Sequence, residues 1–340
     1  MTNTAFARQR SLFKAYDIRG EAILFTPRFQ YALAHAFARH YLNAKAQCVV
    51  IGHDARSICQ QLAHTFATVF TQYQLKIQWL GLVTTPIMAF WVHRHDGMGI
   101  MCTASHSPAN TGGVKWLTHH HSPSQAQVLD LFNILEDVTV DGDSTPPIEY
   151  TDVHNYALTQ YQNTLLAICI KLCPKGKLID TLVIDCLNGA TAVVAESIFS
   201  AIANKVIMLN NTPDGTFPKG NPDPAEPHRL GELQRTVFAY DADLGIAFDG
   251  DGDRVAIVDS TGALLSFDDL LCLLALASMK GGTHKQSALF DVKCLHTLPA
   301  TLAQYSNGQL QGIMTKTGSS HLRAALQGEH KHALFAGELS

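Results

Sequence analysis

Apolar-rich runs alternate with helix-like patterns along the first part of the chain. The runs at Gln47–Gly52, Lys76–Leu80 and Gly99–Thr103 have the length and composition of buried strands. Between them, Ile58–Thr71 and Pro86–His95 repeat apolar residues at helical spacing. This alternation predicts α/β units built around largely parallel sheets.

The same alternation continues to the end of the sequence. A Pro-, Ser- and Asp-rich stretch at 141–147 breaks the pattern and predicts a linker. The next unit has a strand-like run at Leu182–Cys186, which leads into a helix predicted over Ala192–Asn204. We therefore expect three consecutive, related α/β domains with mixed, mostly parallel sheets, over residues 1–147, 148–259 and 260–340.

Composition narrows the possible partners. The 340 residues are 46% hydrophobic and 16% charged, with a net charge of −4 and no basic tail, so nucleic acid is not an expected partner. No segment has the roughly 18–20 apolar residues of a membrane span, and the N-terminus has no apolar signal region. The eight cysteines form no CxxC motif, which favours free thiols in a reducing cytoplasm. The sequence leaves the oligomeric state open.

The segment Asp249-Gly250-Asp251-Gly252-Asp253-Arg254 carries the clearest chemistry. Three carboxylates at alternate positions repel one another unless a cation lies between them. The glycines allow the backbone to curl so that the carboxylates converge. Hard oxygen ligands of this kind, with coordination positions left open, suit Mg²⁺ beside a phosphate group.

Two other interpretations of this segment are weaker. Asp-Gly between two strands is a common hairpin turn, but that turn does not require three acids in register with an arginine. A calcium-binding EF-hand loop also begins D-x-D-x-D, yet it needs Gly at its sixth position and Glu at its twelfth. Arg254 and Ser260 occupy those positions here.

A second segment, Thr103 to Lys115, contains a serine at the carboxyl end of a predicted strand, where open α/β sheets place their ligands. Ser105 becomes a candidate phosphoryl carrier if cations neutralise the transferring group, and His106 and Lys115 are near enough in sequence to contribute. The same residues also suit an ordinary polar turn. A third segment, Tyr16-Asp17-Ile18-Arg19-Gly20, offers an arginine fork that could bind phosphate.

Together these segments resemble the α-D-phosphohexomutases, most closely the bacterial phosphomannomutase/phosphoglucomutase branch. The resemblance covers essentially the whole chain. Its further landmarks, in the family's order, are FKAYDIRG at 13–20, GHDAR at 52–56, VIDCLNGATA at 183–192, DGTFP at 214–218, DVKC at 291–294, TKTG at 315–318 and FAGELS at 335–340.

The resemblance implies a role for each matching residue. Ser105 would carry the phosphoryl group, and Asp249, Asp251 and Asp253 would hold one Mg²⁺ per chain together with Ser105. The groups expected to steady the phosphoryl group or to bind the sugar phosphate are Tyr16, Arg19, His106, Lys115, Arg254, Lys293, Glu338 and Ser340.

The implied reaction moves a phosphoryl group between C1 and C6 of a hexose phosphate, with mannose and glucose phosphates as substrates and a sugar 1,6-bisphosphate as activator. Phosphoglucosamine mutase is an alternative, because its layout is similar. The family's sugar loop reads GExSGH, whereas this sequence stops at Ser340. We therefore expect an incomplete third domain and no fourth domain, and an inactive fragment that only binds metal or sugar phosphate remains a further alternative.

Overall fold

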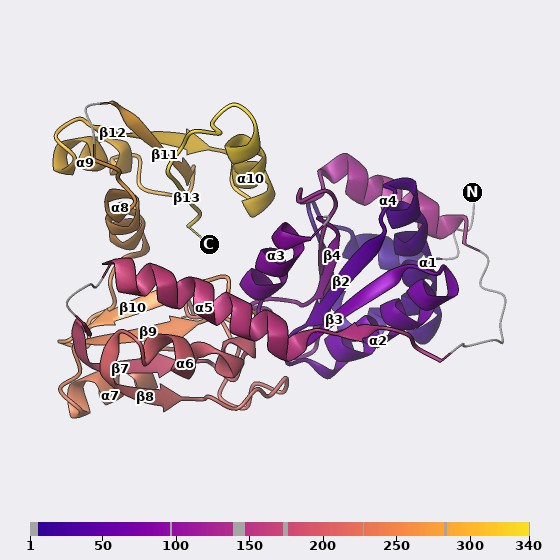
Figure 1. Ribbon diagram of the computed structural model, residues 1–340, viewed down its shortest axis with the longest axis horizontal. Coiled ribbons are helices and arrows are strands. Elements are labelled where there is room, and N and C mark those ends of the chain that lie inside the picture. The colour runs from indigo at the N-terminus through magenta and orange to yellow at the C-terminus, as the bar shows by residue number, and fades with distance from the viewer. Residues whose placement is uncertain are drawn as a thin grey trace. The chain divides into compact units, whose positions relative to one another are not determined.

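The computed structural model describes residues 6–95, 97–138, 147–172, 176–226, 228–281 and 284–339. The chain divides into two compact units, Met1–Gly262 and Ala263–Ser340. Each unit has an α/β architecture with mostly parallel strands, which confirms the fold class predicted from the sequence (Figure 1). The extents of the three predicted domains stay a prediction.

The first sheet of the first unit has the strand order β1-β5-β4-β2-β3-β6. Its strands are β1 (Ile18–Glu21), β2 (Cys48–His53), β3 (Lys76–Leu82), β4 (Gly99–Cys102), β5 (Thr111–Leu117) and β6 (Thr151–Asp152). Its helices are α1 (Pro27–Asn43), α2 (Ser57–Gln72), α3 (Thr85–Arg94) and α4 (Gln125–Glu136). Strands β2, β3, β4 and β6 pair in parallel, whereas β5 runs antiparallel to both β1 and β4.

Side-chain alternation along β2 explains why helices cover both faces of this sheet. Val49 and Ile51 belong to the core formed with α1, α2 and α4, whereas Val50 belongs to the core formed with α3. Figure 1 shows the strands and helices concerned. A strand with apolar residues on both faces needs cover on both sides, which accounts for this layering.

The second sheet of the first unit has the order β10-β9-β7-β8. Its strands are β7 (Ile179–Asp185), β8 (Ala203–Leu209), β9 (Leu244–Phe248) and β10 (Val255–Asp259), and its helices are α5 (His154–Leu172), α6 (Ala195–Phe199) and α7 (Gly231–Ala239). The helix predicted over Ala192–Asn204 is wrong in length. A 3₁₀ turn at Ala190–Val193 precedes the short α6, and the chain already enters β8 at Ala203.

The second unit contains the parallel sheet β12-β11-β13. Its strands are β11 (Gln286–Asp291), β12 (Leu310–Thr315) and β13 (Phe335–Gly337), and its helices are α8 (Phe267–Ala277), α9 (Leu298–Tyr305) and α10 (Ser319–Gln327). Leu271, Phe290 and Leu302 lie in its core, so the unit has an apolar interior of its own.

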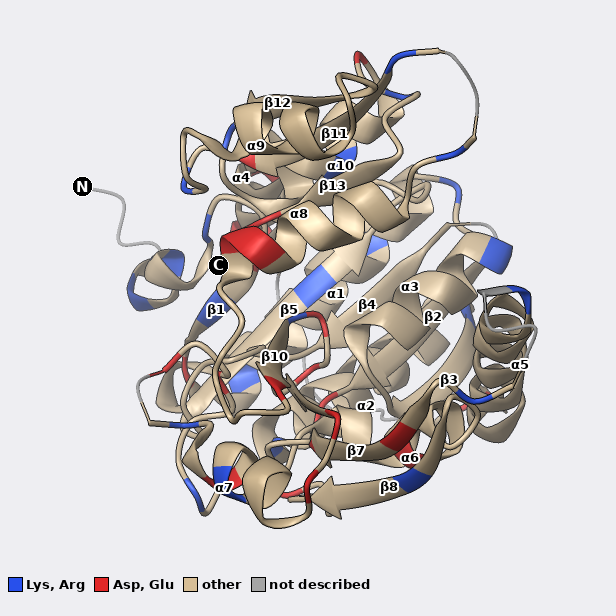
Figure 2. Ribbon diagram, turned by 90° about the vertical axis from the view of Figure 1, so that its left-hand side faces the viewer, with Lys and Arg blue, Asp and Glu red and all other residues tan. Residues whose placement is uncertain are grey.

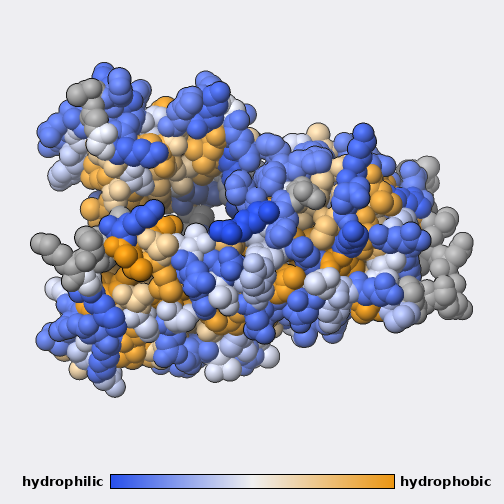
Figure 3. Space-filling model, in the orientation of Figure 1, coloured by the Kyte–Doolittle hydropathy of each residue, from blue (hydrophilic) through white to orange (hydrophobic). Residues whose placement is uncertain are grey.

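Charged residues are scattered along the ribbon, with lysine and arginine in blue and aspartate and glutamate in red (Figure 2). Hydrophobic surface is visible over α5 (Figure 3), where Ile168 and Ile170 are 47% and 69% exposed. Among the described residues, no helix combines the length and the apolar character that crossing a membrane requires.

Candidate active site

The turn between β4 and β5 presents Ser105 in a defined orientation. Ser105 is buried and has a left-handed backbone, with φ of 53°. Its N–H donates to Thr103 Oγ1 at 2.9 Å, and the N–H of Ser107 donates to the Ala104 carbonyl at 3.1 Å. Because the turn satisfies these backbone donors itself, the serine hydroxyl remains available for another partner.

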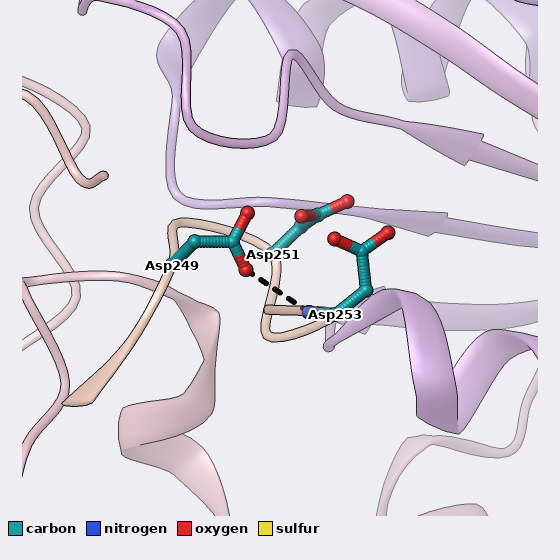
Figure 4. Close-up of side chains that lie close together, drawn as sticks. All are labelled: Asp249, Asp251 and Asp253. Atoms are coloured by element: carbon teal, nitrogen blue, oxygen red, sulfur yellow. Dashed lines mark hydrogen bonds between the residues drawn. The ribbon is translucent and has the colours of Figure 1, made fainter. Parts of the chain in front are cut away.

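The loop between the antiparallel strands β9 and β10 brings the three predicted carboxylates together, as Figure 4 shows for Asp249, Asp251 and Asp253. Asp249 Oδ1 accepts from the N–H groups of Asp253 and Arg254, both at 3.0 Å. Gly252 has φ of 73°, so the loop requires a residue that tolerates the left-handed region at this position. These features hold the loop in the curled form that its sequence predicts.

The serine turn and the carboxylate loop meet, although they belong to different sheets of the first unit. Ser105 Oγ donates to Asp249 Oδ2 at 2.8 Å, and His106 Nδ1 lies 3.4 Å from Ser105 Oγ. A Cβ at Gly250 would lie 2.6 Å from the Ser105 carbonyl oxygen, which is closer than real contacts allow. Glycine at this position therefore lets the two loops approach each other.

Lys115 of β5 and Thr85 of α3 also hold the carboxylate loop. Lys115 Nζ, on β5, donates to Asp251 Oδ2 and Asp253 Oδ2, both at 2.7 Å. Thr85, at the start of α3, donates through Oγ1 to Asp251 Oδ2 at 2.5 Å and through its N–H to the Asp251 carbonyl at 2.9 Å. Asp251 is therefore fixed through one of its two carboxylate oxygens.

The electrostatics of the loop follow from burial and from the short distances between its charges. Burial, together with Asp251 and Asp253, raises the pKa of Asp249 well above its usual range. Burial also works against ionisation of Asp251, but Lys115 outweighs it and lowers the pKa of that carboxyl. Burial would lower the pKa of Lys115, yet the neighbouring carboxylates raise it.

The donor set fits a divalent cation. One ligand oxygen from each of Asp249, Asp251 and Asp253 can be chosen so that all lie within 4.8 Å of one another. Asp251 Oδ1 is buried and has no hydrogen-bond partner among the described residues, so one carboxylate oxygen is available for coordination. Oxygen donors with this spacing suit Mg²⁺.

Positive charge gathers beside Ser105. Burial and the Arg254 cation lower the pKa of His106 to about 4, and Arg19 adds to this effect. His106 is therefore neutral near pH 7.

The two candidate arginines lie on different elements. Arg19 lies on β1 opposite Gly113 of β5, forms an ion pair with Asp17 and comes three residues after the partly buried Tyr16. Arg254 Nη1 lies 3.9 Å from Asp223 Oδ1, which is beyond hydrogen-bond distance, and a guanidinium carries five N–H donors in all.

The remaining candidate residues belong to the second unit. Lys293 is exposed in the turn after β11, Glu338 is partly buried just after β13, and Ser340 lies outside the described residues. The buried Asp291 connects their segments. It accepts from Thr317 Oγ1 at 2.8 Å, from the Leu339 N–H at 3.0 Å and from Cys294 Sγ at 3.3 Å.

Sequence reasoning missed several residues that organise these segments. Arg56 and Asp291 stand within the GHDAR and DVKC landmarks, and Thr85 directly precedes the helix predicted over Pro86–His95, with no role attached to any of the three. Each lies within a few residues of the end of an apolar run, and Arg56 and Asp291 are both charged and buried. A buried charge needs a partner, so that combination is the signal that could have identified them.

Comparisons with known proteins find a group of similar enzymes. The family models for phosphoglucomutase/phosphomannomutase alpha/beta/alpha domains I and II match residues 10–136 and 159–262. A phosphomannomutase/phosphoglucomutase of Pseudomonas aeruginosa is 31% identical over 97% of this chain and 68% of its own length. A phosphoglucomutase of Neisseria meningitidis is 30% identical over 97% of this chain and 69% of its own length.

A solved structure shows the same fold. The crystal structure of a phosphoglucomutase/phosphomannomutase family protein from Burkholderia thailandensis superposes with a TM-score of 0.80 at 27% sequence identity. The match covers 97% of this chain and 70% of that chain.

Proposed function

This chain belongs to the phosphoglucomutase/phosphomannomutase family, and from that premise we propose that it transfers a phosphoryl group between C1 and C6 of mannose or glucose phosphate. The class of reaction is an isomerisation, which conserves the composition of the substrate. The contact that carries the proposal is the 2.8 Å hydrogen bond from Ser105 Oγ to Asp249 Oδ2, because it joins the candidate phosphoryl carrier to the candidate metal loop.

In the proposed reaction, a hydroxyl oxygen of the sugar attacks the phosphorus carried by Ser105. A new P–O bond to the sugar forms as the P–O bond to Ser105 Oγ breaks. The sugar hydroxyl gives up its proton, Ser105 Oγ gains one, and the product is a sugar 1,6-bisphosphate. The other phosphoryl group then returns to Ser105, so the enzyme is regenerated and the phosphate has changed position. A sugar 1,6-bisphosphate can therefore also charge an unphosphorylated chain.

Several candidate residues of the first unit have a defined task in this proposal. Asp249 Oδ2 is the nearest carboxylate oxygen that can take the proton when Ser105 Oγ accepts a phosphoryl group. Lys115, Arg19 and Arg254 supply donors for the charged oxygens of the transferring group. Neutral His106 contributes a hydrogen bond rather than a charge.

Asp249, Asp251, Asp253 and Ser105 would hold Mg²⁺, which when bound would neutralise negative charge on the transferring group. For the second unit we propose that Lys293 lies near the reacting hydroxyl and that Glu338 and Ser340 bind sugar hydroxyls. The shared Asp291 supports this grouping, since it links the turn of Lys293 to the segment that follows Glu338.

Turnover of four sugar phosphates tests the proposal. With Mg²⁺ and a trace of glucose 1,6-bisphosphate, mannose 1-phosphate and glucose 1-phosphate should yield their 6-phosphates, as followed by ³¹P NMR. Glucosamine 1-phosphate should react at least tenfold more slowly, equivalent to about 1.4 kcal/mol of discrimination. Mannose 6-phosphate should yield the 1-phosphate in the reverse reaction.

The other outcomes identify the alternatives. Faster turnover of glucosamine 1-phosphate would indicate a phosphoglucosamine mutase. Release of inorganic phosphate from the bisphosphate without isomerisation would indicate that Ser105 loses its phosphoryl group to water. Binding of sugar phosphate with no reaction at all would contradict the proposed activity.

A further inference from the structure

A buried cation lies directly beneath the serine turn. Arg56 is only 1% exposed, so its guanidinium needs partners inside the protein. It forms an ion pair with Asp54, donates through Nη2 to the Ser105 carbonyl at 2.9 Å, and donates to the Ser107 carbonyl as well. One side chain therefore binds the carbonyls of both neighbours of His106, and one of these neighbours is Ser105.

Asp54 extends this network to the other end of the turn. Its Oδ2 accepts from Thr103 Oγ1 at 2.8 Å and from the Ala104 N–H at 3.3 Å. Thr103 Oγ1 in turn accepts from the Ser105 N–H at 2.9 Å. The Asp54–Arg56 pair thus controls, directly or through Thr103, both the N–H and the carbonyl of Ser105.

The conformation that this network holds is an uncommon one. A non-glycine residue in the left-handed region costs free energy, and it persists only where its surroundings determine it. Ser105 has φ of 53°, and its hydroxyl reaches Asp249 from that backbone conformation. A turn released from Arg56 would relax towards the common backbone regions and carry the hydroxyl away from Asp249.

The loop after β8, in the second sheet's half of the same unit, packs against Arg56. The ring of Phe217, in the loop after β8, lies 4.7 Å from Arg56 Cζ, so its π face can attract the cation. Phe217 is itself buried and has φ of 47°, and Gly215 packs against the backbone of Ala55 and Arg56. The loop that bears Phe217 therefore has little freedom to move away from the guanidinium.

We propose that Arg56 is a positioning residue for Ser105, and that the Asp54–Arg56 pair, covered by Phe217, sets the rate at which Ser105 exchanges a phosphoryl group. This inference rests on the proposed function of Ser105. It predicts that loss of the guanidinium fork lowers the transfer rate and leaves the affinity for the sugar bisphosphate unchanged. If the ion pair only stabilised the fold, its loss would lower the stability of the protein and would not selectively slow phosphoryl transfer.

Arg56→Lys and Phe217→Leu test the proposal. Lysine keeps the charge but has a single nitrogen, so it cannot reproduce the planar fork that serves Asp54 and two carbonyls. Phosphoryl gain from glucose 1,6-bisphosphate, followed by intact-protein mass, should be about 10- to 100-fold slower in Arg56→Lys. Phe217→Leu should slow it by about three- to tenfold, because the cation then loses its aromatic cover.

Arg94→Lys and Phe90→Leu are matched controls, because Arg94 lies over the Phe90 ring at 4.6 Å on α3, away from the serine turn. These two variants should react at the parent rate. A rate for Arg56→Lys within threefold of the parent, or an equal loss in Arg94→Lys, would overturn the proposal. So would a bisphosphate dissociation constant that rises as much as the rate falls.

Crystal structures of the parent and of Arg56→Lys test the positioning itself, and they remain decisive even if the parent gains no phosphoryl group. We expect Ser105 in the variant to leave the left-handed region and its Oγ to separate from Asp249. A variant that keeps φ near the parent's 53° and the 2.8 Å hydrogen bond would overturn the inference. Lack of phosphoryl gain in the parent would instead count against the proposed function.

Discussion

Asp251→Asn is expected to weaken Mg²⁺ binding by more than about 100-fold. Residues that merely support a metal ligand already contribute 10- to 100-fold to affinity, and Asp251 is a proposed ligand. Its Oδ2 is occupied by Lys115 and Thr85, whereas its Oδ1 is buried without a partner, so the side chain is held ready for coordination. Asparagine preserves this shape but removes the negative charge. Isothermal titration with Mg²⁺ measures the change.

Asp259→Asn is the control for this substitution. Asp259 ends β10 on the same hairpin, is exposed, and accepts from the N–H and the hydroxyl of Thr261. Its replacement removes the same charge from the chain and should leave Mg²⁺ affinity within about twofold, because solvent and salt screen an exposed charge at the far end of β10. Similar losses in the two variants would show that net charge, rather than the carboxylate loop, determines binding.

Lys115→Met is expected to lower the free energy of unfolding of the metal-free protein by about 3–5 kcal/mol. The ammonium bonds both Asp251 Oδ2 and Asp253 Oδ2 at 2.7 Å, and its loss leaves the buried Asp251 beside Asp249 without this cation. Mg²⁺ should recover much of the loss, since it binds the folded state and supplies the missing positive charge. Urea unfolding in EDTA and in saturating Mg²⁺ measures both effects.

Lys219→Met supplies the comparison. Lys219 pairs with Glu232 at 2.8 Å, but its side chain is 49% exposed, so its removal should cost less than about 1 kcal/mol and should not depend on Mg²⁺. An unfolding free energy for Lys115→Met that stays at the parent value in EDTA would contradict the role assigned to the ammonium. A loss that Mg²⁺ does not reduce would contradict the assignment of the metal site.

The sequence predicted those features that depend on local patterns. Apolar residues at Val49, Val50 and Ile51 indicated a buried strand, and the Asp249–Arg254 segment indicated a curled acidic loop. Both are present because neighbouring residues largely determine them. The strand β5 was not predicted, since Thr111–Leu117 has two glycines directly after Thr111 and follows a polar turn.

Contacts between segments far apart in the sequence could not be predicted from these local patterns. Thr85 and Asp251 are separated by 166 residues and Ser105 and Asp249 by 144, so neither pair leaves a local periodicity. The buried Arg56 was visible in the sequence only as an arginine after Asp54, and nothing there indicated that it binds the Ser105 carbonyl 49 residues away. Family resemblance supplied the roles of Ser105 and the carboxylates, but not those of the residues that hold them in place.

The most direct test of the central claim is the intact mass of the protein after incubation with Mg²⁺ and glucose 1,6-bisphosphate. We expect the parent chain to gain one phosphoryl group, peptide mapping to locate it on Ser105, and Ser105→Ala to gain none. Ser107→Ala, two residues away in the same turn, should gain the group as the parent does. No gain in a parent protein that is folded and not already phosphorylated, or an equal gain in Ser105→Ala, would contradict the assignment of Ser105 as the phosphoryl carrier.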